Sequence, residues 1–161
     1  MERVEVRKFI YAVALLLTPL IVNAQATGFE ADKSLEANAR KWAEEFIVFA
    51  GKQYAVELDW SHSSIKHLDD IVDDLHATFV EENPPEEQII PVARALGSYV
   101  AEVSRILNGG SWGWVEMPDG SYPAVETRSG IRFLPFAKVL DRIKSGTDPD
   151  IWEYYQMLSA R

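Results

Sequence analysis

Hydrophobic residues recur at helical spacing before Asn108-Gly109-Gly110 and at every second position after it. Residues 111–117 and 122–127 are predicted strands, and the Pro118-Asp119-Gly120 turn joins them as a hairpin. A further turn leads into a third predicted strand over residues 131–134. The sequence therefore predicts a three-stranded antiparallel meander that follows a helical region.

Helices are predicted on both sides of this meander, where apolar residues form stripes with a 3.6-residue period. Their expected ranges are 34–50, 64–80, a short turn at 84–89, 91–107 and 135–144, with a last helix that Asp148-Pro149 begins. Pro91 lacks a backbone N–H and crowds the preceding turn, so we expect it to separate the short turn from the helix that follows. Residues 53–58 are expected to be extended. The order of elements predicts one α+β domain: three helices, the meander, and two C-terminal helices packed on one sheet face.

The first 26 residues have the layout of a secretory signal peptide. Basic residues precede an apolar run, and small residues suit cleavage after Ala24 or Ala26. The alternative is a retained membrane anchor, but residues 9–22 are shorter than the roughly 20 residues that a spanning helix needs. We therefore expect residues 27–161 to form the mature domain, without a membrane span, in the periplasm or outside the cell.

Composition excludes several classes of protein. None of the 161 residues is Cys, which excludes a disulfide framework, a thiolate metal site and a Cys nucleophile. Lys and Arg number 16 against 25 Asp and Glu, and the formal net charge is −9. Nucleic acid is therefore not expected as a partner, because its binding proteins concentrate positive charge on one face. The first 26 residues carry three basic and two acidic side chains, so their removal changes the net charge to −10.

Three stretches of the chain form a familiar set: LDWSHSSIKHLDD at 58–70, ALGSYVAEVSRILNGGSWGW at 95–114 and RFLPFAKVLDRIKSG at 132–146. Together they resemble a bacterial domain of unknown function. In that domain a Leu-Asp-x-Ser start leads to a helix, followed by a Gly-x-Tyr-x-Gly-Glu helix, a Trp-bearing strand and a Pro-led helix with an Arg. Ala101 stands here at the position of the second Gly. The resemblance supports the α+β fold and implies no activity.

Two groups of polar residues around the start of the second predicted helix have residue types that could support hydrolysis. His67, Asp70 and Asp74 share one helical face at spacings of three and four, which suits a divalent metal held by imidazole and carboxylates. His62 and Asp59, beside a Ser, supply the types of a base and its orienting group. The simpler interpretations are a solvated acidic face for the first group and helix capping for Asp59. We favour these and expect no metal and no cofactor.

Glu102 and a pair of Trp residues are further candidates. Glu102 lies at the border of the apolar stripe of its helix, where it could act as an acid or base or pair with Arg132 or Arg142. We favour the ion pair. Trp112 and Trp114 are two apart on a predicted strand and share one face. We expect one of them to be buried and the other to be partly exposed, as a stacking platform would be.

Two further predictions concern packing. Gly97, Ala101 and Ser104 form a strip of small residues on the helix expected at 91–107. Because Gly inside a helix costs about 1 kcal/mol relative to Ala, close contact with another backbone is expected along this strip. His76 lies near the edge of the apolar stripe of its own helix and is expected to be a partly buried structural residue.

The strongest charge feature is a run of eight carboxylates: Asp69, Asp70, Asp73, Asp74, Glu81, Glu82, Glu86 and Glu87. Such a run is commonly a solvated face, and any role it has is attraction of a basic partner. The first functional hypothesis is an exported, non-enzymatic, inhibitor-like or immunity-like domain that binds a basic envelope or secreted protein. Its candidate contact residues are Asp70, Asp73, Asp74, Glu102, Trp112 and Trp114. The alternatives are a small metal-assisted hydrolase, using His67 with Asp70 and Asp74 or His62 with Asp59, and a structural domain of the envelope.

Overall fold

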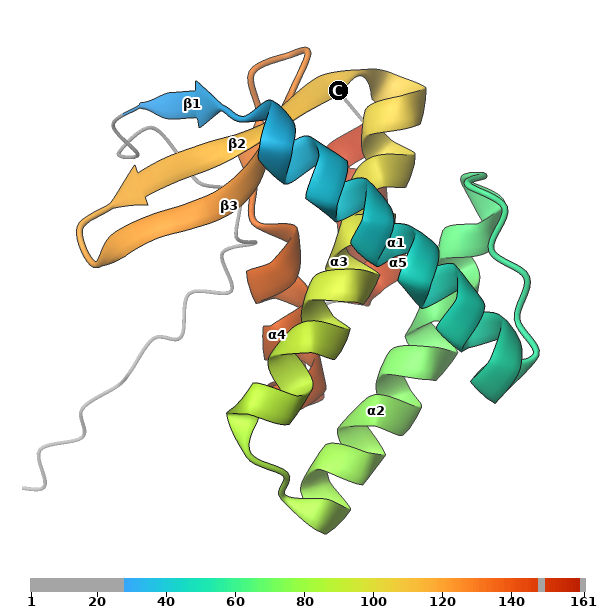
Figure 1. The fold of residues 1–161 in the computed structure, drawn as a ribbon. Coiled ribbons are helices and arrows are strands. Elements are labelled where there is room, and N and C mark those ends of the chain that lie inside the picture. Colours follow the sequence, from blue (N-terminus) through green and yellow to red (C-terminus); the bar gives the residue numbers. More distant parts are fainter. Residues whose placement is uncertain (1–27, 148–149, 160–161) are drawn as a thin grey trace, which may run out of the picture.

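The computed structural model describes residues 28–147 and 150–159, in which a small antiparallel sheet adjoins a larger group of helices (Figure 1). In chain order the elements are β1 (Phe29–Ala31), α1 (Lys33–Tyr54), the 3-10 helix η1 (Ser63–His67), α2 (Leu68–Glu82), α3 (Glu86–Asn108), β2 (Gly110–Met117), β3 (Gly120–Thr127), β4 (Arg132–Phe133), α4 (Pro135–Ser145) and α5 (Ile151–Ser159). The predicted α+β class is confirmed. The predicted signal peptide at 1–26 and the Asp148-Pro149 cap lie outside the described residues. Within the described ranges, no helix combines the length and hydrophobicity needed to span a bilayer.

The sheet has four strands in the order β1-β2-β3-β4, all antiparallel, and not the three strands that were predicted. The additional strand, β1, pairs with β2, with Phe29 opposite Val115 and Ala31 opposite Gly113. A Cβ atom at Gly113 would collide with the Glu30 carbonyl oxygen, so the glycine allows this close approach. Three residues are too few to form a pattern of alternation, so β1 could not be predicted from hydrophobic spacing.

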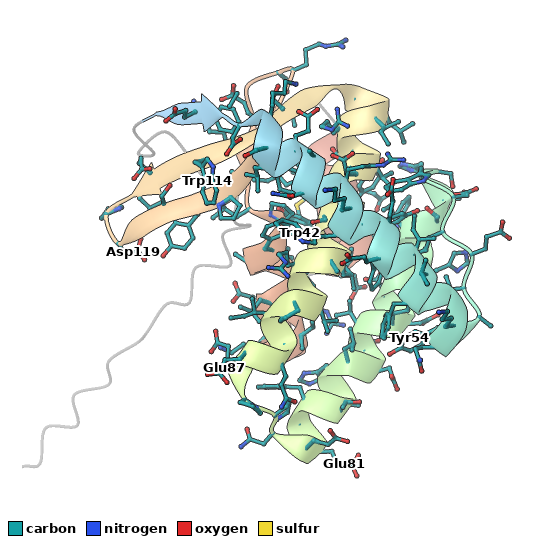
Figure 2. All side chains as sticks on the ribbon, in the orientation of Figure 1. Trp42, Tyr54, Glu81, Glu87, Trp114 and Asp119 are labelled. Atoms are coloured by element: carbon teal, nitrogen blue, oxygen red, sulfur yellow. The ribbon has the colours of Figure 1, made fainter. Side chains whose placement is uncertain are left out.

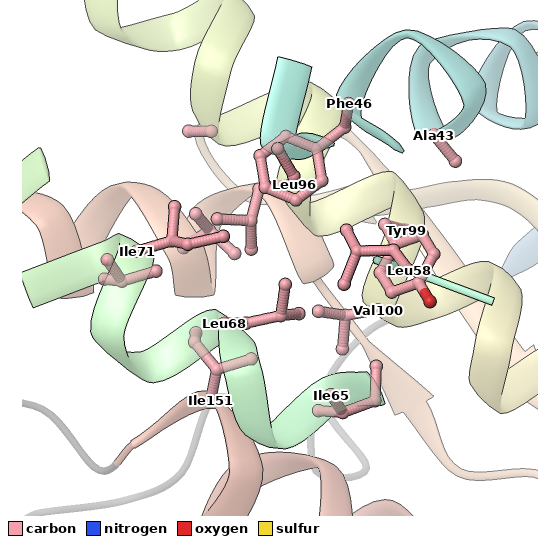
Figure 3. Packing of buried hydrophobic residues seen from close by; sticks show 14 of the residues in the cluster. Ala43, Phe46, Leu58, Ile65, Leu68, Ile71, Leu96, Tyr99, Val100 and Ile151 are labelled. Carbon is pink, nitrogen blue, oxygen red and sulfur yellow. The ribbon is translucent and has the colours of Figure 1, made fainter. Parts of the chain in front are cut away.

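The main core lies among the helices, where apolar side chains from α1 to α5, from η1 and from the loop before it meet (Figure 3). Its members include Ala43, Phe46, Leu58, Ile65, Leu68, Ile71, Leu96, Tyr99, Val100 and Ile151. The periodic stripes predicted these contacts only in part, because Leu75 and Phe79 at the far end of the α2 stripe stay half-buried. Burial of such a cluster removes apolar surface from water and is the main force that holds the helices together.

Each face of the sheet contributes to a further cluster. Trp112, Val125 and Phe133 pack with side chains of the helices, among them Tyr154 of α5. Val115 and Ala124 alternate with Trp112 and Val125 along the strands and pack in a smaller cluster with Leu134. The ring of Phe136 on α4 lies 5.4 Å from the ring of Trp112. Both C-terminal helices therefore contact the Trp112 face of the sheet.

The prediction that Pro91 separates two helices is wrong, because α3 runs without interruption from Glu86 to Asn108. Pro91 is the sixth residue of this helix and is exposed. The missing N–H would have bonded to the carbonyl group of Glu87, which is also an exposed residue, so water can satisfy that oxygen. Solvent access at the start of the helix therefore makes the proline tolerable.

The prediction that residues 53–58 are extended is also wrong for residues 53 and 54, which belong to α1. Helix α1 continues past Gly51 to Tyr54, and Ala55 ends it in a left-handed conformation with φ 54°. The side chain of Leu58 then enters the main core. Burial of residues in the following loop depends on tertiary packing that local spacing does not encode.

The strip of small residues on α3 makes the close contact that was predicted for it. A Cβ atom at Gly97 would lie 2.7 Å from the carbonyl oxygen of Pro135 and 3.1 Å from the amide nitrogen of Phe136. Helix α4 thus begins directly against the backbone of α3 at Gly97, and the other two residues of the strip, Ala101 and Ser104, are buried. The predicted small-residue packing is confirmed.

Candidate functional site

Three of the α2 aspartates form contacts within the protein and do not simply face solvent. Asp69 accepts hydrogen bonds from the backbone N–H groups of Ile151 at 2.6 Å and Trp152 at 3.3 Å, so it caps α5. Burial raises the pKa of the Asp69 carboxyl above its ordinary value, and the two N–H donors oppose that rise. Asp73 pairs with Arg142 of α4. These aspartates therefore connect α2 to both C-terminal helices.

Asp74 is held in a similar way by α1. The Tyr54 hydroxyl donates a hydrogen bond to its carboxylate at 2.9 Å. Burial, together with this bond and the charge of Asp74, raises the pKa of Tyr54 to about 12. Asp70 is exposed, and its side chain has no partner among the described residues. Of the three aspartates predicted as a contact surface, only Asp70 is thus uncommitted.

The three histidines lie in different environments. His67 is exposed, and His62 packs its ring against Trp152 at 4.7 Å and Tyr155 at 5.1 Å. Nδ1 of His76 lies 2.7 Å from the carbonyl oxygen of Ile143, so the prediction of a partly buried structural histidine is confirmed. In the part of the chain that the structure describes, no three His, Asp or Glu side chains gather as metal ligands would.

Asp59 lies in the loop that precedes η1. Its carboxylate accepts the backbone N–H of Ser61 at 3.0 Å, and Ser61 Oγ accepts the backbone N–H of Ser64 at 3.2 Å. Hydrogen bonds from the side chain and the backbone N–H of Ser61 lower the pKa of Asp59. The bond from Ser64 to Ser61 Oγ satisfies a donor at the start of the helical region. Ser61 thus bonds an amide of the first turn of η1, as a cap would, whereas Asp59 bonds to Ser61 within the loop and does not cap the helix as predicted.

Glu102 is fully buried and lies at the centre of a polar network at the junction of α3 and the sheet. Its carboxylate accepts two hydrogen bonds from Arg105, at 2.8 and 2.9 Å, and one from the indole N–H of Trp112 at 2.8 Å. Arg40 approaches within 3.8 Å. The expected ion pair is present, but its partners are Arg105 and Arg40 and not Arg132 or Arg142. Helical spacing of three residues could have indicated Arg105.

The two tryptophans of β2 differ in burial as expected. Trp112 is fully buried, whereas Trp114 is half-buried and donates its indole N–H to Asp32 at 2.9 Å. The same Asp32 caps α1 by accepting the backbone N–H groups of Ser34 and Leu35. This hydrogen bond from Trp114, with those from Ser34 and Leu35, lowers the pKa of Asp32 to about 2.

The structure does not unite the predicted contact residues in one surface. Glu102 and Trp112 are buried, and Asp73 and Asp74 bind neighbouring elements. Figure 2 shows Trp114 on the sheet and Glu81 at the opposite end of α2. The candidate functional regions are therefore two: one at the end of α2 near Glu81 and one at the sheet near Trp114.

One candidate region that was not predicted as a separate surface lies where α2 and α3 meet. We call it the acidic corner, and it consists of the four glutamates around the turn at 83–85: Glu81, Glu82, Glu86 and Glu87. All four are exposed. Glu86 pairs with Lys144 at 3.3 Å, and no ion pair of the other three is present among the described residues. The left-handed Asn83, with φ 45°, turns the chain there, and Figure 2 shows Glu81 and Glu87 at this end of the molecule.

A groove of about 160 Å³ opens at the acidic corner. Its walls are mostly apolar and include Phe79, Ile89 and Ile143, while Glu82 and Gln88 contribute polar atoms. Val80, on the neighbouring turn of α2, is 65% exposed. Leu75 and Phe79, at the end of the apolar stripe of α2, line this groove and are the residues in the sequence that could have indicated it.

Comparison with known proteins gives a likeness of fold only. No family model matches the chain, and no curated protein matches it in sequence. A crystal structure from Bacteroides thetaiotaomicron VPI-5482, determined at 1.50 Å resolution, aligns with a TM-score of 0.55 and 13% sequence identity. The alignment covers 82% of this chain and 47% of that one, so this chain spans about half the length of its structural neighbour.

Proposed function

We propose that this protein is an exported, non-enzymatic domain that binds a basic protein partner through the acidic corner, in the manner of an inhibitor or immunity protein. The observation that carries the proposal is an apolar groove lined by Glu82, next to exposed Glu81 and Glu87, and none of these three carboxylates has an ion pair within the described part of the chain. Asp69, Asp73 and Asp74 are excluded from this surface because they serve the fold.

The chemistry of the acidic corner favours a partner with Lys or Arg next to an apolar side chain. The apolar side chain would leave water on entering the groove beside Phe79 and Ile89, which supplies affinity. The carboxylates of Glu81, Glu82 and Glu87 would pair with the basic residues and raise the rate of encounter. A net charge of −9 over the whole chain adds to that attraction.

Export remains part of the proposal and is supported by the sequence pattern of residues 1–26. In that case residues 27–161 are the working domain in the periplasm or outside the cell. N-terminal sequencing of the protein recovered from an envelope fraction tests this, since it should begin at Gln25 or Thr27. An intact Met1 on envelope protein would contradict cleavage.

Site-directed crosslinking tests the binding surface. A photoreactive amino acid replaces Gln88, which lines the groove, or Gln156, an exposed residue of α5 that does not line it. After irradiation in an envelope extract, position 88 should yield a crosslinked protein with a basic isoelectric point, and position 156 should not. The yield should fall as salt is raised, because screening weakens exposed charge pairs.

Charge variants make this experiment specific. E81Q/E82Q/E87Q should abolish the crosslink, whereas E45Q/E57Q/E116Q, which removes three exposed carboxylates elsewhere, should preserve it. Equal yields from both triple variants would overturn the proposed surface. The absence of any crosslink at position 88 at low salt would overturn the proposed function.

A further inference from the structure

A second hollow lies on the other side of α3, between that helix, α1, α4 and the sheet. It has a volume of about 420 Å³, within the range of small-molecule sites. We call it the aromatic pocket, and the lining residues that matter here are Trp42, Ile90, Arg94, Trp114, Tyr122 and Phe136. Figure 2 labels Trp42 on α1 and Trp114 on β2, the two tryptophans of its wall.

Most polar atoms of these rings already have partners. The indole N–H of Trp114 donates to Asp32 at 2.9 Å, and the Tyr122 hydroxyl donates to Asp119 at 3.0 Å. The rings of Trp42 and Phe136 meet edge to face, with centroids 5.9 Å apart. The wall therefore presents apolar ring faces and offers a ligand few hydrogen bonds.

Arg94 is the exception. Its guanidinium carbon lies 4.4 Å from the centre of the Trp42 ring, and its Nε atom is buried without a hydrogen-bond partner. Within the described residues, no carboxylate lies in ion-pair distance of Arg94, although the protein is strongly acidic. A buried polar atom without a partner costs free energy, so an unpaired guanidinium beside an apolar pocket calls for an explanation.

We propose that the aromatic pocket binds a small amphiphilic monocarboxylate. The apolar part of the ligand would lie against Trp42, Trp114 and Phe136, and its carboxylate would accept hydrogen bonds from the Arg94 guanidinium, whose planar fork matches a carboxylate. One cation in an otherwise apolar wall indicates a single negative charge on the ligand. Ile90, which is 44% exposed, lies on the wall and leaves the pocket accessible from solvent.

This ligand chemistry has two sources, a straight-chain fatty acid and a planar aromatic acid, and calorimetric titration distinguishes them. The probes are decanoate, 2-naphthoate and the uncharged 2-naphthalenemethanol, each added to the whole protein. We expect saturable 1:1 binding of at least one acid. Binding of decanoate alone would identify a straight chain, and binding of 2-naphthoate alone would identify a planar ligand. The neutral alcohol should bind at least about tenfold more weakly than 2-naphthoate where the latter binds, because it cannot pair with a cation.

Two variants and a control test the roles of charge and shape. R94Q should weaken binding of the acid at least about tenfold, since a hydrogen bond between two charged groups contributes more to affinity than one between neutral groups. R128Q removes an exposed arginine that does not line the pocket and should leave the affinity unchanged. I90W should fill the pocket and reduce binding without a change of charge. Thermal denaturation of each variant confirms that it is folded.

Several outcomes would overturn the proposal: no saturable binding of either acid up to millimolar concentration, equal affinity for 2-naphthoate and its alcohol, or unchanged affinity in R94Q. The acidic corner plays no part in this titration, so its result is independent of the proposed function.

Discussion

Glu102 shows how one buried charge can join several elements. It lies on α3 and receives hydrogen bonds from Arg105 on the same helix and from Trp112 on β2, with Arg40 of α1 nearby. A buried carboxylate is costly in the absence of such partners, and here the donors surround it. Its role is therefore to fix the sheet against the helices.

The substitution E102Q tests this role. It preserves the shape of the side chain but leaves Arg105 without its buried counter-charge, so we expect a loss of about 3 kcal/mol in the free energy of unfolding. Urea denaturation measures the change. E44Q serves as the control, because Glu44 is an exposed partner of Arg40 and should change stability by less than about 0.5 kcal/mol. A loss in E102Q no larger than the control would show that the network adds nothing.

Asp32 provides a prediction about pH. Its pKa of about 2 in the folded protein lies below the unfolded value near 4, so its ionised form stabilises the native state. That contribution is complete above about pH 4 and is lost as the pH falls towards 2. D32N should therefore melt at a lower temperature than the wild type at pH 6, and the two melting curves should converge near pH 2. A constant difference across this range would contradict the assignment.

At the scale of elements, α3 and α4 can pack closely because Gly97 has no side chain. Gly97 lies against the backbone of Pro135, and the first turn of α4 cannot move away without exposing Val139 and Ile143. Helix propensity alone would favour Ala at this position by about 1 kcal/mol. The contact therefore outweighs the local preference of the helix.

G97A and G51A form a matched pair that separates these effects. Both glycines lie inside helices, but a Cβ atom at Gly51 would meet only the Val56 carbonyl oxygen, at 3.8 Å. We expect G51A to stabilise the protein by about 0.5–1 kcal/mol and G97A to destabilise it by about 2 kcal/mol. Chemical denaturation of both variants gives the comparison. Stabilisation by G97A would mean that α3 and α4 are not in close contact.

At the scale of the whole molecule, Asp69 closes the fold by binding the start of α5, which is more than 80 positions away in sequence. The acidic run thus has two functions that the sequence does not separate. Its first part connects α2 to α1, α4 and α5, and its last part leaves charge exposed at the acidic corner. In the first part only Asp70 is free of such contacts, whereas Glu81, Glu82 and Glu87 in the last part are all exposed without an ion pair among the described residues.

D69A should release α5, while D70A should not. Both residues lie in the first turn of α2 and carry the same charge, so they affect the helix dipole similarly. Loss of the cap should cost about 1–2 kcal/mol in D69A, and D70A should stay within about 0.5 kcal/mol of the wild type. Hydrogen exchange at the amides of Tyr154 and Tyr155 should accelerate in D69A. Equal exchange in both variants would show that α5 docks without the cap.

Predictions that depend on residues close together in the sequence agree with the structure better than predictions that depend on tertiary contacts or solvent exposure. The spacing of Leu35, Ala39 and Phe46 predicted α1, and the alternation around Trp112 predicted the β2–β3 hairpin, because these patterns report burial of one local face. The continuous α3 through Pro91 was missed because solvent access to the Glu87 carbonyl cannot be read from spacing. For the candidate site, the acidic run located the carboxylates of the acidic corner but not the groove beside them.

The amino-acid sequence by itself determined the α+β class, most helix positions, the hairpin and the small-residue contact at Gly97. Each of these depends on residues that are close in the chain or on the size of a single side chain. The tertiary structure alone decided that β1 joins the sheet, that Glu102 meets Arg40 and Trp112, that Asp69 caps α5, and that Arg94 faces an aromatic pocket. These depend on partners brought together from distant segments, and a linear pattern gives the type of each group but not its neighbour in space.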